Sequence, residues 1–397
     1  MNGLKTDTII NRDALYALRE LPEESVHCCV TSPPYYALRD YGLDAQIGRE
    51  DTPEQYIDRL TEVFRELRRV LRSDGTFWLN IADTYCGTGN KGYHADPKNP
   101  KGRNGQQIAR NNRVSGCKQK DLIGIPWLLA FALRADGWYL RSDIIWAKKN
   151  CMPESVKDRP TKSHEYIFLL SKSQSYYYDN EAIKEPSVTG KWDAMPPIGG
   201  VKHTESGENP TYSGNTPSNN GMRNKRDVWF VSTKPYKGAH YATFPPDLIT
   251  PCILAGAPET CCAECGAPYA RVAKIVGKQV TESMRIAGCN DAGEYNGQAT
   301  KDFESAKAQN ASDTKRRILE SMSQVKDYSF EPTCTCNAGT TSGIVFDPFV
   351  GSGTTVATAI QLGRRGVGLD LSFKYLNENA KARIDDVRLP LLEDAWK

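Results

Sequence analysis

The stretch Asp347-Pro-Phe-Val-Gly-Ser-Gly-Thr-Thr355 decides the fold of this chain. An apolar run, Gly343–Asp347, precedes it, and a run of helical character, Thr354–Leu362, follows it. The order predicts a strand, a glycine turn and a helix start. Gly351 and Gly353 allow the backbone to approach a ligand closely, and the helix start presents unpaired N–H groups.

A second acidic residue, Asp370, lies at the distance along the chain that a nucleotide site of this kind requires. The predicted strand Arg365–Asp370 ends on Asp370, roughly 20 residues after Asp347, and at that spacing a carboxylate meets a ribose hydroxyl in nucleotide-binding α/β folds. The two acids and the turn therefore predict a nucleotide-type cofactor site. An ordinary strand-to-helix turn is the alternative.

The chain before this stretch alternates strands with helices. Thr52, Pro53 and Gln55 form a helix start with a capping residue. Apolar residues then recur at helical spacing up to Asp74-Gly75, where we expect the helix to end. The other predicted elements are strands at 25–31, 76–82, 138–147 and 165–170 and helices at 125–136 and 373–386. This order predicts an α/β sheet covered on both faces.

Composition excludes several classes of protein. Of the 397 residues, 39% are hydrophobic and 25% charged, which suits a packed core and not a disordered chain. The longest apolar run, Ile125–Leu133, is too short to span a bilayer, and the first residues lack a signal-peptide pattern. We therefore expect no membrane association and a cytoplasmic location. The net charge of +3 does not by itself predict a partner.

A second motif, Thr31-Ser-Pro-Pro-Tyr35, directly follows a predicted strand. Two prolines there force a rigid, non-helical turn. Together with the 347–355 stretch, the motif resembles those of the β-class DNA amino-methyltransferases, which modify N4 of cytosine or N6 of adenine. The resemblance covers roughly residues 7–85, 121–171 and 228–386. It implies a Rossmann-like fold that binds S-adenosylmethionine, with loop-rich DNA-recognition insertions.

The resemblance also implies roles for individual residues. The Ser32 side chain and the Pro33 carbonyl would accept hydrogen bonds from the target amine, beside Pro34, and Tyr35 would stack on a base flipped out of double-stranded DNA. The cofactor residues it implies are Asp13, Thr31, Phe244, Asp347, Phe349, Gly351, Gly353, Thr354, Thr355 and Asp370. Two of them match more loosely: Arg12 precedes Asp13 where the family often has glycine, and Phe244 could instead be a buried aromatic.

The first residue of the catalytic motif bears on the target base. The family usually has serine there in N4-cytosine enzymes and aspartate in N6-adenine enzymes, so Ser32 favours cytosine N4, with adenine N6 as the alternative. Methylation at cytosine C5 would need a nucleophilic cysteine. Cys252 follows a proline but lies on a predicted helix, where we expect it in the core.

Four of the twelve cysteines have the spacing of a metal site. Cys262-Ala-Glu-Cys265-Gly266 suits a turn around tetrahedral Zn²⁺, and Cys334-Thr-Cys336 would complete four thiolates. We predict a structural zinc that holds a small insertion. Free thiols are the alternative, and Cys261 competes with Cys262 as a ligand.

Two polar stretches interrupt the α/β pattern. Residues 85–120 carry eight Lys or Arg and one acid, which suits phosphate contacts, and residues 185–235 suit target recognition. The predicted organisation is a catalytic half (1–84, 121–184), a basic DNA-contacting insertion (85–120), a target-recognition region (185–235), a cofactor-binding half (236–260, 337–397) and a cysteine-rich insertion (261–336).

The leading hypothesis is therefore a site-specific DNA methyltransferase with double-stranded DNA as its partner. The resemblance also allows a cognate restriction endonuclease as a partner, and a homodimer. Two other classes remain open on the residues alone. A nicotinamide-dependent oxidoreductase would share the glycine turn, and a zinc protein could bind nucleic acid without catalysis. An RNA substrate is a further alternative.

Overall fold

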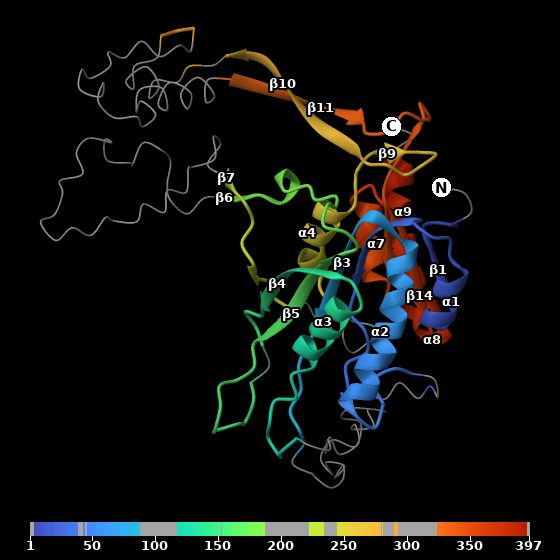
Figure 1. Ribbon diagram of the computed structural model, residues 1–397, viewed down its shortest axis with the longest axis vertical. Helices are drawn as coiled ribbons and strands as arrows, with labels where there is room; N and C mark the ends of the chain where they lie inside the picture. Colours follow the sequence, from blue (N-terminus) through green and yellow to red (C-terminus); the bar gives the residue numbers. More distant parts are fainter. Residues whose placement is uncertain are drawn as a thin grey trace, which may run out of the picture. The chain divides into compact units, whose positions relative to one another are not determined.

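The computed structural model describes residues 4–38, 43, 46–87, 117–151, 153–186, 222–233, 244–278, 280, 290–292 and 324–394 (Figure 1). They divide into two compact units. The first comprises residues 1–183, 226–268 and 334–397, and the second residues 184–225 and 269–333.

An eight-stranded sheet with the order β1-β14-β13-β2-β3-β5-β4-β8 organises the first unit. Its strands are β1 (Thr8–Asn11), β2 (Val26–Thr31), β3 (Leu71–Ile81), β4 (Tyr139–Ala147), β5 (His164–Ser171), β8 (Val228–Phe230), β13 (Ile344–Asp347) and β14 (Arg365–Asp370). Strands β1, β14, β13, β2 and β3 pair in parallel, whereas β5 is antiparallel to both β3 and β4. The sheet is therefore mixed.

Helices cover both faces of this sheet, as predicted. Helices α1 (Ala14–Glu20), α2 (Pro53–Val70) and α3 (Ile125–Ala135) pack in one core with Cys29 and Phe77. Helix α4 (Pro246–Gly256) packs in a second core with Cys28 and Trp78, on the opposite face. Helix α7 (Thr354–Gln361) lies between α4 and α9 (Lys381–Asp394). Successive residues of β2 and β3 face opposite cores because strand side chains alternate.

The helix start at residue 52 is confirmed, but its predicted end is wrong. Thr52 accepts a hydrogen bond from the Gln55 N–H at 3.2 Å, and Pro53 opens α2. The helix ends at Val70, and β3 begins at once with Leu71, which pairs with Val26. Asp74 and Gly75 therefore lie inside a strand. The fully buried Leu71 explains the early change, because its side chain packs in the core beneath the sheet.

The C-terminal helix also differs from the single helix predicted at 373–386. It consists of α8 (Phe373–Tyr375), a π-helical turn (Leu376–Ala380) and α9. Ala380 lies against the Gly353 turn, where a Cβ on Gly353 would approach Ala380 to 3.0 Å. The close approach explains the need for glycine at this position, whose φ is +79°.

Short strands complete both units. Strands β9 (Cys261–Cys262) and β12 (Thr340–Thr341) pair antiparallel in the first unit. The second unit contains β10 (Tyr269–Lys278) paired with β11 (Gln324–Pro332), and β6 (Glu185–Pro186) paired with β7 (Met222–Arg223). A short 3₁₀ helix spans Glu181–Ile183.

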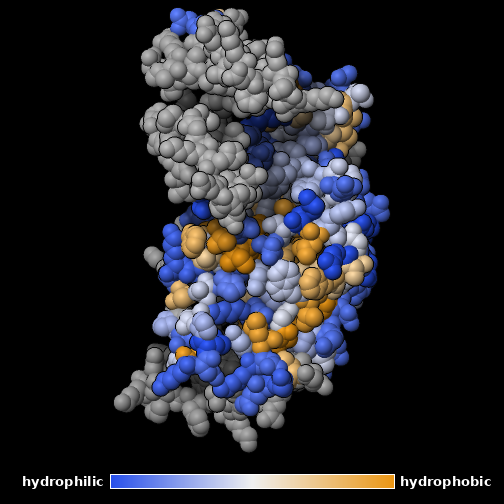
Figure 2. Space-filling model, turned by 60° about the vertical axis from the view of Figure 1, so that its left-hand side comes forward, coloured by the Kyte–Doolittle hydropathy of each residue, from blue (hydrophilic) through white to orange (hydrophobic). Residues whose placement is uncertain are grey.

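On the face that Figure 2 presents, the hydrophobic side chains of the described residues form separate patches between hydrophilic ones. None of the helices that the structure describes has both the length and the apolar composition to cross a membrane.

Candidate active site

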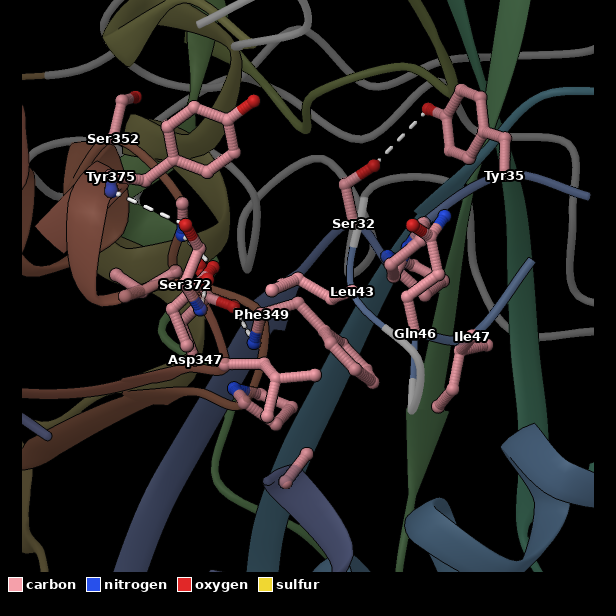
Figure 3. A pocket seen from close by; sticks show the side chains of 18 of the residues that line it. Ser32, Tyr35, Leu43, Gln46, Ile47, Asp347, Phe349, Ser352, Ser372 and Tyr375 are labelled. Atoms are coloured by element: carbon pink, nitrogen blue, oxygen red, sulfur yellow. Dashed lines mark hydrogen bonds between the residues drawn. The ribbon is translucent and has the colours of Figure 1, made fainter. Parts of the chain in front are cut away.

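The candidate site lies at one edge of the sheet, where parallel strands end together. Strands β2, β13 and β14 end at Thr31, Asp347 and Asp370, and the segments that follow them line a common pocket. Figure 3 shows Ser32 and Tyr35 on one side of this pocket and Ser372 and Tyr375 on the other. In open α/β sheets, ligands bind in the crevice that lies outside the carboxyl ends of the strands.

The predicted site residues come together here, although three of them do not line the pocket and lie behind the residues that do. The pocket is lined by Asp13, Ser32, Pro33, Pro34, Tyr35, Phe244, Asp347, Phe349, Gly351, Thr354 and Asp370, together with ten residues that include Leu43, Gln46, Ile47, Ser372 and Tyr375. Thr31 and Thr355 are fully buried and bond to Asp347 instead. Gly353 forms the turn before α7.

The buried carboxylate of Asp347 connects three segments of the site. Its carboxylate accepts hydrogen bonds from the Thr31 and Thr355 hydroxyls, both at 2.6 Å, and from the Phe349 N–H at 3.0 Å. Burial raises the pKa of Asp347 to about 6, because an ionised carboxylate loses hydration that these three donors only partly replace. The carboxylate thus ties the end of β2 to the glycine turn and to α7.

Asp370 shapes the glycine turn from the neighbouring strand. One carboxylate oxygen accepts from the Gly351 N–H at 2.9 Å and the other from the Ser372 N–H at 2.7 Å. Burial raises the pKa of Asp370 above its ordinary value. Each carboxylate oxygen has a second lone pair, so both can still accept a hydrogen bond from a ligand hydroxyl.

Asp13 reaches the pocket from the start of α1. Its side chain caps the helix by accepting from the Leu15 and Tyr16 N–H groups at 3.0 and 3.1 Å. Strand β1 ends just before Asp13, and the Arg12 N–H bonds to the Asp370 carbonyl at 3.0 Å. Arg12 itself turns to Glu20, with which it forms an ion pair.

A chain of hydrogen bonds leads away from Ser32. The Ser32 hydroxyl donates to the Tyr35 hydroxyl at 3.1 Å, and Tyr35 donates to Glu165 at 2.7 Å. Lys148 forms an ion pair with the other Glu165 oxygen, and Asn80 donates to Glu165 at 3.2 Å. Burial, and then the charge of Glu165, hold the pKa of Tyr35 well above its usual range, so its phenol stays protonated.

Sequence reasoning missed Glu165, Asn80 and Lys148. Glu165 reaches this edge because β5 runs antiparallel to β3, which places the start of one strand beside the end of the other. One signal was available: Glu165 is an acid at the start of the apolar run Tyr166–Leu170. Leu43, Gln46 and Ile47 gave no such signal.

The four predicted metal ligands also come together. The sulfur atoms of Cys262, Cys265, Cys334 and Cys336 all lie within 4.8 Å of one another. Sulfur ligands about 2.3 Å from a Zn²⁺ ion lie about 3.8 Å apart, so the cluster fits a tetrahedral site after a small contraction.

The neighbouring thiol, Cys261, points elsewhere. It donates to the Thr341 carbonyl at 3.3 Å, and burial raises its pKa to about 11. Backbone N–H groups of Cys265 and Glu264 lower the pKa of Cys262 to about 7. Of the two candidates, Cys262 is therefore the one in the cluster. Cys252 is fully buried in α4, as expected.

Some predicted features lie outside the described residues. Most of the basic segment 85–120 and of the 185–235 region belongs to them. Their predicted roles stay predictions.

The site combines a glycine turn linked to two acids with a Ser-Pro-Pro-Tyr turn. Both turns lie at the carboxyl edge of a sheet that helices cover. This combination defines a class of group-transfer enzymes that bind a nucleotide-type cofactor. The N6/N4 family model described as DNA methylase matches residues 26–260 and 294–381 of this chain. The chain therefore belongs to the N6/N4 DNA methylase family. This membership decides against the oxidoreductase hypothesis.

Individual relatives agree with the family. The type II methyltransferase M.Cfr9I of Citrobacter freundii is 52% identical over 249 residues, which cover 62% of this chain and 72% of that protein. M.SmaI of Serratia marcescens is 48% identical over 255 residues, 64% of this chain and 77% of that protein. A solved structure described as PvuII DNA methyltransferase (cytosine-N4-specific) is 13% identical with a TM-score of 0.48, covering 98% of this chain and 93% of that one.

Proposed function

We propose that this type II DNA methyltransferase transfers a methyl group from S-adenosylmethionine to N4 of cytosine in double-stranded DNA. The observation that carries the proposal is the orientation of Ser32. A hydroxyl has one proton, and Ser32 donates it to Tyr35, so its lone pairs remain to accept a hydrogen bond. An acceptor is what an exocyclic amine needs beside it.

The residues around Ser32 suit that task. The amine would donate its two N–H groups to the Ser32 hydroxyl oxygen and the Pro33 carbonyl, which draws the nitrogen lone pair out of conjugation with the ring. Tyr35 would present its ring to the flipped base while its hydroxyl is held by Glu165. Proton loss can follow methyl transfer, so no strong base is required.

The opposite wall suits the cofactor. When bound, S-adenosylmethionine supplies the electrophilic methyl group. Asp370 would accept the ribose hydroxyls, Gly351 would let the backbone approach, and Phe349 would lie against the adenine. Asp13 and Phe244 would contact the cofactor from α1 and from the segment before α4.

The choice of cytosine rests on Ser32, since N6-adenine relatives usually carry aspartate there. Nucleoside analysis of DNA methylated by the purified enzyme should yield N4-methylcytosine, and long-read mapping should return the recognition sequence. N6-methyladenine as the product would reject the cytosine assignment and leave the amino-methyltransferase class intact. A cognate endonuclease and a homodimer remain predictions.

The test of Ser32 is a single-turnover experiment. Ser32→Ala removes one acceptor that acts mainly in the transition state, so methyl transfer should slow roughly 10- to 150-fold while cofactor and duplex binding persist. Ser25→Ala is a matched control, because Ser25 lies just before the other end of β2 and bonds to the Pro22 carbonyl. An unchanged rate in Ser32→Ala would refute the role of this turn in catalysis.

We also propose that the cysteine cluster binds one structural Zn²⁺. Four sulfur atoms within 4.8 Å of one another support this, since thiolates in that arrangement match the ligand set zinc prefers. Elemental analysis should find one zinc per chain. Cys265→Ser should lose it, whereas Cys151→Ser, a thiol outside the cluster, should keep it.

A further inference from the structure

The cysteine turn contacts the sheet through its backbone and not only through its sulfur atoms. Residues 262–267 form a tight turn, with the Gly266 N–H bonded to the Cys262 carbonyl and the Cys262 N–H to the Ala267 carbonyl, both at 2.9 Å. This turn leaves the carbonyls of Cys265 and Gly266 pointing to two side chains of the sheet, Arg72 and His27.

His27 joins the turn to two central strands. It is the second residue of β2 and is 3% exposed. Its Nδ1 accepts from the N–H of Ile344, the first residue of β13, at 3.0 Å. The backbone N–H can only donate, so a neutral ring carries its proton on Nε2, which lies 2.9 Å from the Gly266 carbonyl. The imidazole therefore bridges β2, β13 and the cysteine turn.

Arg72 joins the turn to a third strand. It lies on β3, and its Nη1 donates to the Cys265 carbonyl at 2.6 Å. Asp74 on the same strand pairs with Arg72 at 2.8 Å and fixes the direction of the guanidinium. The Arg72 side chain is only 12% exposed, whereas Cys265, whose carbonyl accepts the hydrogen bond, lies at the surface.

The second half of the cluster continues directly into the sheet. After Cys334 and Cys336 the chain forms β12, which pairs with β9, and then enters β13 at Ile344. Arg365 at the start of β14 donates to the Thr341 hydroxyl at 2.8 Å. The amino ends of β2, β3, β13 and β14 thus all meet the segments that carry the cysteines.

We propose that the metal-bound cysteine turn is a clamp on the amino ends of β2, β3 and β13, with His27 and Arg72 as its positioning residues. This rests on the zinc proposed above. The ion holds the turn in the conformation that presents the Cys265 and Gly266 carbonyls, and those carbonyls hold the strands that carry Ser32 and Asp347 at their other ends.

Hydrogen exchange of the full-length protein tests the clamp. After zinc is removed with a chelator, the amides of 26–31 and 344–347 should exchange at least about 10-fold faster. Those of β4 and β5, which do not contact the turn, should be unchanged. His27→Asn should keep zinc and retain an acceptor for the Ile344 N–H, but its shorter side chain falls short of Gly266. It should raise exchange at the same strands without a chelator.

The outcomes separate the claims. A protein that holds zinc, but whose β2 and β13 exchange is unaffected by its removal, overturns the clamp and leaves the metal site standing. An equal rise in β4 and β5 overturns it too, because the effect would then be global. A protein without zinc rejects both proposals and leaves methyl transfer untouched.

Discussion

Replacing Asp347 with asparagine should make the protein more stable at neutral pH while weakening its cofactor binding. The carboxylate is 1% exposed and accepts three hydrogen bonds. Asparagine can keep them: its oxygen accepts from Thr31 and the Phe349 N–H, and its amide donates to Thr355. The Thr355 hydroxyl can then turn to the Val30 carbonyl, 3.3 Å away.

The magnitude follows from the pKa. Burial raises the pKa of Asp347 from 3.8 to about 6, so the folded state binds a proton more tightly than the unfolded state. The stability that this proton contributes is fully present below pH 4 and is lost as the pH rises through 6. The difference between the two pKa values corresponds to about 3 kcal/mol, of which about 1.4 kcal/mol is lost between pH 5 and pH 8. The asparagine side chain does not titrate, so Asp347→Asn should gain that much over wild type across this interval.

Urea unfolding at several pH values between 5 and 8 measures the difference in the free energy of unfolding between Asp347→Asn and wild type. Asp143→Asn is the control, because it removes the same charge from an exposed position. Calorimetry should show weaker S-adenosylmethionine binding by Asp347→Asn at pH 8, because the charge that would attract the methionine ammonium is lost. A variant that is less stable than wild type at pH 8, or whose difference from wild type does not vary with pH, would refute the reasoning.

Two further substitutions probe the opposite walls of the pocket. Asp370→Asn should weaken cofactor binding roughly 10- to 150-fold, because the variant loses a charge-assisted acceptor and holds the Gly351 N–H less firmly. Calorimetry measures this affinity. An unchanged affinity would contradict the proposed contact between Asp370 and the ribose. Tyr35→Phe keeps the ring but breaks the link from Ser32 to Glu165, so single-turnover transfer should slow about 10-fold with duplex binding intact. A wild-type rate would show that the Ser32 orientation needs no phenol.

The sequence predicted the local features of the site because short-range chemistry dictates them. The Gly351 and Gly353 turn, the proline turn after β2 and the capped start of α2 each depend on a few adjacent residues. Asp370 was predicted near the turn because it ends the strand that follows, at the spacing from Asp347 that nucleotide-binding folds have. These features were confirmed in the structure, whereas the roles of the residues in binding and catalysis remain predictions.

What escaped prediction depends on strand pairing. Periodicity in a single strand does not reveal the direction of its neighbours, so the antiparallel β5 and the arrival of Glu165 beside Tyr35 were not foreseen. The end of α2 was misplaced for a similar reason. Asp74-Gly75 is a strong local stop signal, but the pairing of Leu71 with Val26, a contact distant in sequence, ends the helix first.

The two ends of β2 have separate proposed roles, which decides how variants of the cysteine cluster should be interpreted. His27 and Ser32 are five residues apart, about 16 Å along an extended strand. A change at the cysteine turn therefore cannot touch a base held by Ser32. Strand β2 is paired on both sides, with β13 and β3. Loosening one end of β2 should therefore make local unfolding of the whole strand more frequent, and should not shift its other end by a small distance. Loss of zinc should consequently lower the fraction of active molecules while each folded molecule keeps its single-turnover rate.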